Sequence, residues 1–186
     1  MLRSLVFDIS DWCRGKNWLW RLPVLIFFSY VFIRHVLDPE YTSIFGALNL
    51  GVHELGHLVF AFFGDFLCAA GGTIAQLLIP VIGAVNFYRQ KDYFGISFAF
   101  GWLSTSFFES ARYIGDARAM DLPLVTFFWA DDAQHDWNYL LSRMGILQLD
   151  TGIAFAVKIL AVISMCMCFF LGITIIALMI KSKDSR

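Results

Sequence analysis

The sequence GVHELGHLVF, residues 51–60, places two histidines and a glutamate inside a run of apolar residues and glycines. His53 and His57 are four residues apart, so on a helix of about 3.6 residues per turn their side chains project from one face. Ionisable groups in such an apolar helix are costly without a partner and mark functional sites. A metal ion held between the two imidazoles would be that partner, so the stretch predicts a helix that carries a metal site.

The spacing of these residues is typical of zinc hydrolases. In the pattern His-Glu-x-x-His the histidines bind zinc, which lowers the pKa of a bound water, and the glutamate acts as general base. His53 and His57 are therefore predicted as zinc ligands and Glu54 as the catalytic base. Asn49, one turn before His53, extends the polar face of this helix and is a candidate to line a substrate groove.

The composition is that of a membrane protein. Of the 186 residues, 59% are hydrophobic and only 16% are charged, and the mean hydropathy is +0.67. Soluble domains contain about 25% charged residues. The net charge of −1 provides no basic patch large enough for a nucleic-acid partner. We therefore expect membrane lipids as partners, and the length fits a single membrane domain, residues 1–186, with no separate soluble domain.

Apolar runs along the chain predict an all-α integral membrane protein. Residues 1–17 carry apolar and charged groups on opposite sides of a helix, which favours an amphipathic helix at the membrane interface. About five transmembrane helices are expected from the length and hydrophobicity of the remaining runs, at about 18–37, 39–63, 66–88, 93–113 and 159–180.

Adjacent glycines near the start of the third predicted span lie beside the metal motif. Gly71 and Gly72 allow close helix packing, and this is one explanation for them. Pro80 implies a break in the same span, so the opened backbone could equally line a substrate groove. Gln76 is the polar residue expected nearest the metal. Together with Asn49, we take Gly72 and Gln76 as substrate-groove candidates.

A catalytic zinc commonly has three protein ligands and keeps one position for water. The second and fourth predicted spans run in the same direction, so the segment after the fourth span emerges on the side toward which the histidine motif is displaced. An apolar piece at 122–130, too short to span, could re-enter the bilayer and carry a ligand inward. The candidates for the third ligand, in order of preference, are His135, Asp116, Asp136 and Asp150. A carboxylate that does not bind the metal could instead orient a ligand imidazole.

The motif His53-Glu54-Leu55-Gly56-His57 in an apolar helix, followed by a span with two adjacent glycines, resembles the site-2 protease group of intramembrane zinc metalloproteases. That family cleaves membrane-embedded peptide segments with two histidines and a glutamate on one transmembrane helix and an aspartate from a later one. The resemblance implies that His53 and His57 bind zinc and that Glu54 is the base. The later Asn-Pro-Asp-Gly or Leu-Asp-Gly motif of the family is not present as such, and Leu149-Asp150-Thr151-Gly152 is a poor substitute for it.

Two further stretches, Asp116-Ala117-Arg118-Ala119 and the run from His135 to Leu140, resemble a group of small, uncharacterised bacterial membrane proteins. This resemblance supports His135 and Asp116 as site residues and implies a location in the bacterial inner, or cytoplasmic, membrane. It names no substrate.

The sequence thus leads to an intramembrane zinc metalloprotease, acting on a transmembrane peptide, as the first functional hypothesis. A zinc-dependent hydrolase of lipid amides or esters is the second, because zinc-bound hydroxide attacks any suitably placed carbonyl. The third is a membrane scaffold that keeps the metal for structure. Four protein ligands in a closed site would favour the scaffold, and an open position beside Glu54 would favour catalysis.

Overall fold

The computed structural model describes residues 2–123 and 135–184, and all regular secondary structure in this part of the chain is helical. This confirms the all-α class. The seven α-helices are α1 (Leu2–Cys13), α2 (Leu22–Leu37), α3 (Phe45–Phe60), α4 (Asp65–Arg89), α5 (Tyr93–Gly115), α6 (Asp136–Arg143) and α7 (Asp150–Asp184). Three short 3-10 helices precede α2, follow α3 and precede α7, namely η1 (Trp18–Trp20), η2 (Ala61–Phe63) and η3 (Leu147–Leu149).

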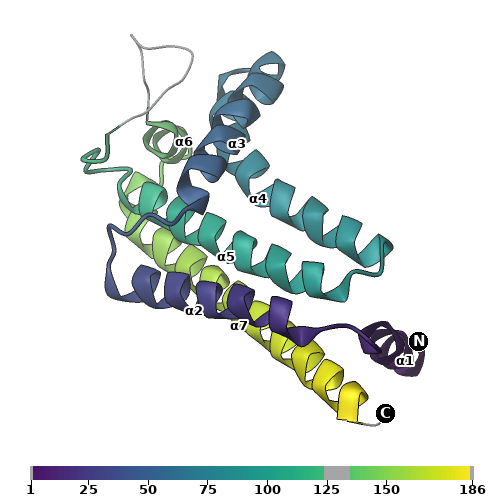
Figure 1. Cartoon of the computed structure of the whole chain (residues 1–186). Coiled ribbons are helices and arrows are strands. Elements are labelled where there is room, and N and C mark those ends of the chain that lie inside the picture. Colours follow the sequence, from purple (N-terminus) through teal and green to yellow (C-terminus); the bar gives the residue numbers. More distant parts are fainter. Residues whose placement is uncertain (1, 124–134, 185–186) are drawn as a thin grey trace.

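The long helices share a common direction, and the helix with the histidine motif departs from it. Figure 1 shows α2, α4, α5 and α7 running roughly alongside one another, while α3 rises steeply from them next to α6. α5 packs along both α4 and α7, and α3 packs mainly on α4. Both described ends of the chain lie at one end of this bundle, and α3 and α6 lie at the other (Figure 1).

Three helical segments are long and apolar enough to cross a membrane, which indicates a membrane protein. They are Trp18–Leu37, Asp65–Arg89 and Leu147–Ser182. The predicted span 39–63 needs correction, because the structure divides it into a loop, the 16-residue α3 and η2. At about 1.5 Å per residue α3 is about 24 Å long, less than the roughly 30 Å of a hydrocarbon core. A crossing by residues 93–113 stays a prediction.

Small residues and hydroxyl groups form the seam between α5 and α7. Ser97 and Ser104 of α5 donate hydrogen bonds to the carbonyl oxygens of Cys168 and Ala161, both at 2.7 Å. Ser164 of α7 donates in return to the carbonyl of Phe100 at 2.8 Å. Small side chains let helix backbones approach closely, and each hydroxyl here forms a hydrogen bond within the apolar interior. The seam fixes α5 against α7 along most of its length.

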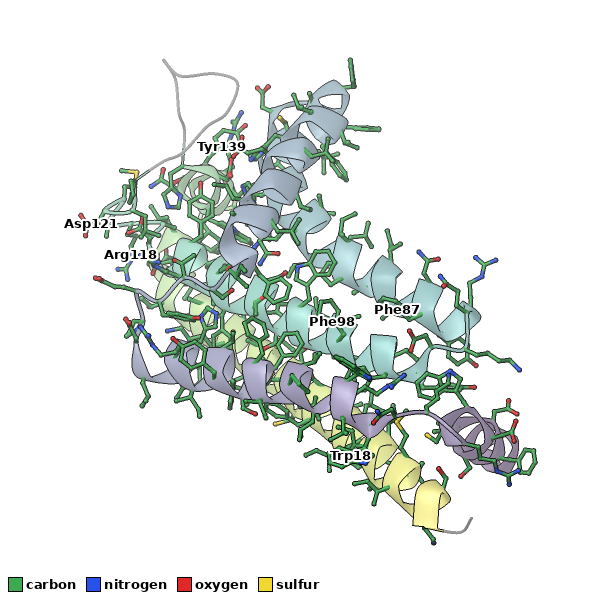
Figure 2. All side chains as sticks on the ribbon, in the orientation of Figure 1. Trp18, Phe87, Phe98, Arg118, Asp121 and Tyr139 are labelled. Atoms are coloured by element: carbon green, nitrogen blue, oxygen red, sulfur yellow. The ribbon has the colours of Figure 1, made fainter. Side chains whose placement is uncertain are left out.

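Aromatic side chains fill the space between α2, α3 and α5. The Phe28 ring is fully buried, stacks on Phe45 and meets Phe98 edge-on, with ring centroids 5.9 and 5.5 Å apart. Phe98 is marked in Figure 2 within this interior. Phe28 also occupies a niche over Gly101, where an added Cβ would lie 2.5 Å from its ring. This packing positions the start of α3 against α5, two turns before the first motif histidine.

The last two helices depart from the sequence-based boundaries. α7 begins at Asp150, nine residues before the predicted start at residue 159, because the prediction began the span after the charged Lys158, and the helix continues back through the apolar residues 152–157 to Asp150. α6, within a stretch expected to be polar connection, is a helix with His135 as its N-cap. Of the apolar piece 122–130, residues 124–130 lie outside the described part, so the re-entrant segment stays a prediction.

The N-terminal helix was expected at 1–17 and is present as α1. It packs on the last part of α7, where the Cys13 thiol lies 3.8 Å from the carbonyl oxygen of Ile175. Trp12 packs edge-on against Tyr93, and the Lys16 ammonium lies over the Trp12 ring, 3.4 Å from its centroid. α1 therefore belongs to the end of the bundle farthest from the histidine motif (Figure 1).

Candidate metal centre

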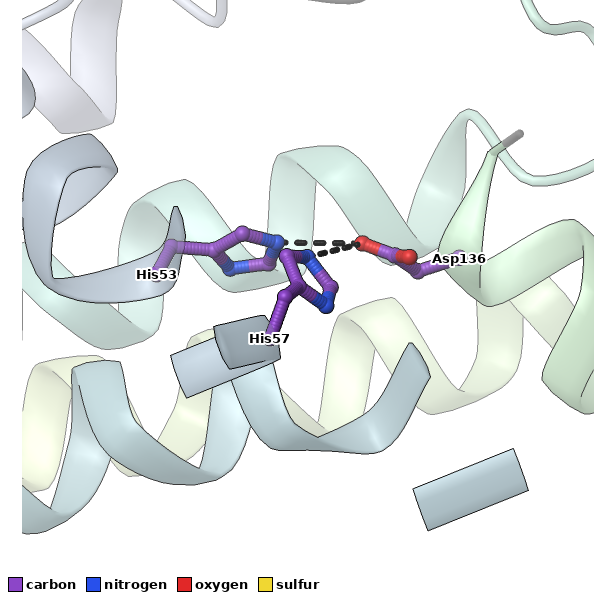
Figure 3. A group of neighbouring side chains, drawn as sticks. All are labelled: His53, His57 and Asp136. Carbon is purple, nitrogen blue, oxygen red and sulfur yellow. Dashed lines mark hydrogen bonds and ion pairs between the residues drawn. The ribbon is translucent and has the colours of Figure 1, made fainter. Parts of the chain in front are cut away.

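Three side chains converge at the junction of α3 and α6. His53 and His57 lie one turn apart on α3, and Asp136 is the first residue of α6. The Nε2 atoms of His53 and His57 lie 3.0 and 3.3 Å from the same carboxylate oxygen, Oδ2 of Asp136 (Figure 3). One possible ligand atom from each residue falls within 4.8 Å of the others. The group could hold a metal ion, and its members come from segments 83 residues apart.

The remaining ring nitrogen of each histidine has its own partner. His57 Nδ1 lies 2.8 Å from the carbonyl oxygen of Cys68, and His53 Nδ1 lies 3.3 Å from Oε1 of Gln76. A carbonyl oxygen only accepts, so these contacts place the proton on Nδ1 and leave a lone pair on Nε2. Three electron-pair donors then face one another, and a cation between them relieves their repulsion. This is how ligand imidazoles are oriented in metal sites.

A hydrogen-bond network behind His53 holds Gln76 in the required orientation. The Gln76 amide nitrogen lies 3.5 Å from both the Ser106 carbonyl and Oε2 of Glu109, which are acceptors, so the amide oxygen faces His53. Asn49 donates to the same Glu109 oxygen at 2.6 Å. The chain of contacts thus links the α3 histidine through α4 to the buried carboxyl of α5.

Close approach of α3 to α4 depends on glycine. A Cβ at Gly56 would collide with the Gly71 carbonyl oxygen, and a Cβ at Gly72 would lie 2.5 Å from Nε2 of His53. Only glycine provides the necessary space at these positions. Gly72 was predicted to line a substrate groove, and in the structure it lies against the ring of a metal-ligand candidate. The glycines therefore allow close helix packing and also lie beside the candidate metal ligands.

Contacts from α4 and α5 fix Asp136. Its backbone N–H donates to the Tyr113 hydroxyl at 3.0 Å, and that hydroxyl lies 3.3 Å from its carboxylate Oδ2. The neighbouring Trp137 donates its indole N–H to Thr73, and the Asn138 amide donates to the carbonyl of Ala117. Burial raises the pKa of the Asp136 carboxyl, but the adjacent imidazoles of His53 and His57 outweigh this and hold the pKa below its usual value. The carboxylate is thus ionised and aimed at the histidines.

A cavity of about 990 Å³ adjoins the three side chains and includes all of them in its wall. Glu54 is half-buried, lines the same cavity, and forms no hydrogen bond or ion pair with the residues the structure describes. Its carboxylate is therefore available to a water molecule beside the histidines. The remaining wall comes from the end of α2, the loop before α3, α5 and the start of α7, and is mostly apolar.

The predicted groove residues occupy different places. Gln76 lines the cavity as expected. Asn49 is buried away from it, where its amide oxygen accepts from Trp102 at 2.8 Å and Ser106 at 3.2 Å. Its position one turn before His53 extends the polar face, but this polarity serves the contact between α3 and α5.

The third-ligand candidates separate clearly. His135, ranked first, points its Nε2 toward Asp116, ranked second, at 3.3 Å, and its Nδ1 accepts the Asn138 N–H at 3.2 Å. Asp150 pairs with Arg118 at 2.8 Å at the start of α7. Only Asp136, ranked third, reaches His53 and His57. The reason is local: the N-cap position turns the His135 ring back onto its own helix, and the next residue projects away from it. The geometry thus favours Asp136 over His135 as ligand.

Sequence reasoning missed two contributors to the site. The Cys68 carbonyl is a backbone group with no residue-type signal, and it reaches His57 only because α4 folds back on α3. Tyr113 lies at the end of an apolar run, where its residue type gives no signal of a metal site. Its proximity to Asp136 depends on where α6 docks, which no spacing along the chain reveals.

Comparison with known proteins adds no assignment to this geometry. Neither a protein-family model, nor a curated protein, nor a solved structure matches the chain significantly. The function is therefore argued from the site.

Proposed function

We propose that the protein is a membrane-embedded zinc metallohydrolase that cleaves peptide bonds, with Glu54 as the general base. The observation that carries this proposal is the convergence of His53 Nε2, His57 Nε2 and Asp136 Oδ2 at the wall of a cavity. Three protein ligands with a free position are the pattern of catalytic zinc, whereas structural zinc usually has four. This argues against the metal-holding scaffold.

The ligand set fits zinc but does not define it alone. Two histidines and one carboxylate with open positions also bind ferrous iron in oxygenases. The residue that favours hydrolysis is Glu54, which follows His53 directly and has a free carboxylate on the cavity. When bound, zinc would lower the pKa of a water and polarise the scissile carbonyl. Glu54 would accept the proton of that water and return it to the leaving amine.

A peptide substrate is favoured by the resemblance to site-2 proteases, whose two histidines and later aspartate correspond in kind to His53, His57 and Asp136. The mostly apolar cavity suits an unwound segment of a membrane-embedded polypeptide. In this proposal the chain resides in a bacterial cytoplasmic membrane, with residues 93–113 crossing it next to the three segments of sufficient length. The same site could hydrolyse a lipid amide or ester, and the experiment below distinguishes lipid cleavage from peptide cleavage.

The test uses the zinc-loaded protein in liposomes with a pool of labelled transmembrane peptides, analysed by mass spectrometry. We expect about one zinc per chain and defined peptide fragments from the wild type. Glu54→Gln should keep its zinc and yield no fragments, because the amide preserves shape but cannot act as base. Glu40→Gln, in the loop before α3, is the matched control and should cleave normally.

Three results would overturn the proposal. Equal fragmentation by wild type and Glu54→Gln would reject Glu54 as base. Intact peptides together with fatty acids or lysolipids released by the wild type alone would assign the site to a lipid hydrolase. Iron in place of zinc in elemental analysis would point to oxygenase chemistry.

A further inference from the structure

Lys158 is the one charged residue of α7 between Asp150 and Lys181. It lies eight residues after Asp150, about 12 Å along α7 at about 1.5 Å per residue. The segment Leu147–Ser182 that contains it is long and apolar enough to cross a membrane. Lysine in such a segment is costly and usually marks a functional contact, unless it reaches the interface.

The Lys158 side chain faces the cavity of the metal centre. Thr151, Ala154, Phe155 and Lys158 all line it, and their spacing of three, one and three residues defines a single face of α7. Within residues 2–123 and 135–184, Lys158 forms no hydrogen bond or ion pair. The ammonium group thus contributes a positive charge to the cavity wall that no carboxylate of the described residues pairs with directly.

A second cation lines the same cavity. Arg112 of α5 donates to the Glu40 carbonyl at 3.1 Å and lies 3.5 Å from the Thr42 hydroxyl, so neutral groups hold it in place. It forms no ion pair within 4 Å among the described residues. Arg118, by contrast, is neutralised by Asp150 at 2.8 Å. Of these three cations at the site end of the bundle, the two that line the cavity are the two that form no ion pair with a carboxylate among the described residues, although Arg112 lies near enough to the Glu109 carboxyl to interact with it electrostatically.

We propose that Lys158, assisted by Arg112, forms an anion subsite that binds an aspartate or glutamate side chain of the peptide substrate. This inference rests on the proposed function, because a polypeptide occupant makes the anionic group a carboxylate of that chain. Charge-assisted hydrogen bonds to a carboxylate in an apolar cavity are among the stronger polar contacts. The subsite would select acidic residues near the scissile bond, while His53, His57, Asp136 and Glu54 act on the peptide group.

The test uses two amidated peptide hydroxamates that differ only in one residue, glutamate or glutamine. The hydroxamate binds zinc directly, so no natural substrate is needed. Titration calorimetry of the zinc-loaded wild type should show the glutamate probe binding about tenfold tighter or more, as expected for a hydrogen bond to a charged group. Lys158→Met should remove most of this preference, Lys158→Arg should retain it, and Arg112→Met should weaken it. Arg89→Met, at the exposed end of α4, is the control and should bind both probes as the wild type does.

The outcomes separate the two proposals. Equal binding of the two probes by the wild type, or an unchanged preference in Lys158→Met, would refute the anion subsite while leaving the metal site intact. Failure of both probes to bind, or binding that survives His53→Ala plus His57→Ala, would refute the proposed function and the subsite with it. Loss of the wild-type preference on adding dioleoylphosphatidylglycerol, but not dioleoylphosphatidylcholine, would assign the two cations to a lipid headgroup and overturn the proposal.

Discussion

The molecule contains two groups in which a histidine side chain lies beside an aspartate carboxylate. They differ in the partners of the two ring nitrogens of each histidine. At the first, His53 and His57 turn both Nε2 atoms toward Asp136 beside a cavity, and their Nδ1 atoms face acceptors. At the second, His135 is 3% exposed and its Nδ1 accepts a backbone N–H. Nδ1 is therefore unprotonated in neutral His135, so Nε2 carries the proton, and it lies 3.3 Å from the Asp116 carboxylate without forming a hydrogen bond to the described residues.

The same comparison extends to the carboxylates. Asp136 presents its oxygen to two imidazoles, whereas Asp116 also accepts the backbone N–H groups of Asp121 and Leu122 at 3.0 and 3.1 Å. In the second group the Asp116 carboxylate thus accepts from the chain after α5, and the His135 imidazole caps the start of α6. The first leaves electron pairs convergent and could hold a metal ion. Residue type alone does not separate a metal ligand from a structural contact, but the identity of the partners does.

The largest expected effect distinguishes the histidines of the two groups. His53→Ala plus His57→Ala should lower zinc content from about one per chain to near zero and abolish hydrolysis, because two of three ligands are lost. His135→Asn should keep about one zinc, since asparagine also serves as an N-cap and preserves the start of α6. Elemental analysis of the purified proteins measures both. Loss of zinc from His135→Asn, with helical content unchanged, would move the third ligand to His135.

The second prediction compares the aspartates. Changes around metal ligands typically lower affinity about 10- to 100-fold, so removal of a ligand carboxylate in Asp136→Ala should lower zinc affinity by more than about 100-fold. Asp116→Ala removes a carboxylate of the other group and should change affinity less than about tenfold while lowering thermal stability. Competition with a fluorescent zinc chelator gives the affinities. Similar losses in the two variants would mean that the groups are not functionally distinct.

The third prediction concerns the space behind the first group. Gly72→Ala should displace the His53 ring, because the new methyl would lie 2.5 Å from its Nε2, and zinc affinity should fall about 10- to 100-fold. Gly83→Ala on the same helix is the matched control, since nothing lies within 4 Å of a Cβ there. It should leave zinc affinity unchanged and make the protein slightly more stable. Equal affinities in the two variants would show that the His53 ring can move without consequence.

The smallest effect on zinc affinity is expected at Tyr113, whose side chain contacts both groups. Tyr113 bonds Asp136 through its hydroxyl and packs its ring on His135, with centroids 4.3 Å apart. Tyr113→Phe keeps the ring contact and removes only the hydroxyl, so zinc affinity should fall by about tenfold with little loss of stability. Tyr88→Phe, at an exposed position on α4, serves as the control. An unchanged affinity in Tyr113→Phe would mean that other contacts of α6 suffice to position the carboxylate.

Several features were predictable because they depend on local pattern. The helical class, α1 and three membrane-length segments follow from apolar periodicity. His53, Glu54 and His57 lie within one turn of one helix, so their shared face is fixed by helix geometry alone. Boundaries were predicted less well: the run 39–63 contains a loop and a short α3, and Lys158 made α7 seem to begin after it although the helix starts at Asp150.

The third ligand candidate could not be chosen from the sequence for a physical reason. His135 and Asp136 are adjacent, and both residue types bind zinc. Their roles depend on the start of α6, where the N-cap histidine turns back onto the helix and the following aspartate points outward. That orientation in turn depends on bonds to Tyr113 of α5, Thr73 of α4 and Ala117 in the turn after α5.

The sequence by itself determined a helical membrane protein and a pair of histidines with an adjacent glutamate, because these depend on composition and on the repeat of one helix. Only the tertiary structure decided that Asp136 joins the histidines, that His135 pairs with Asp116, and that Lys158 lines the same cavity as Glu54. Each of these relations joins residues at least 19 positions apart. Packing of α3, α5, α6 and α7 brings them together, and helical spacing along a single segment carries no information about such distances.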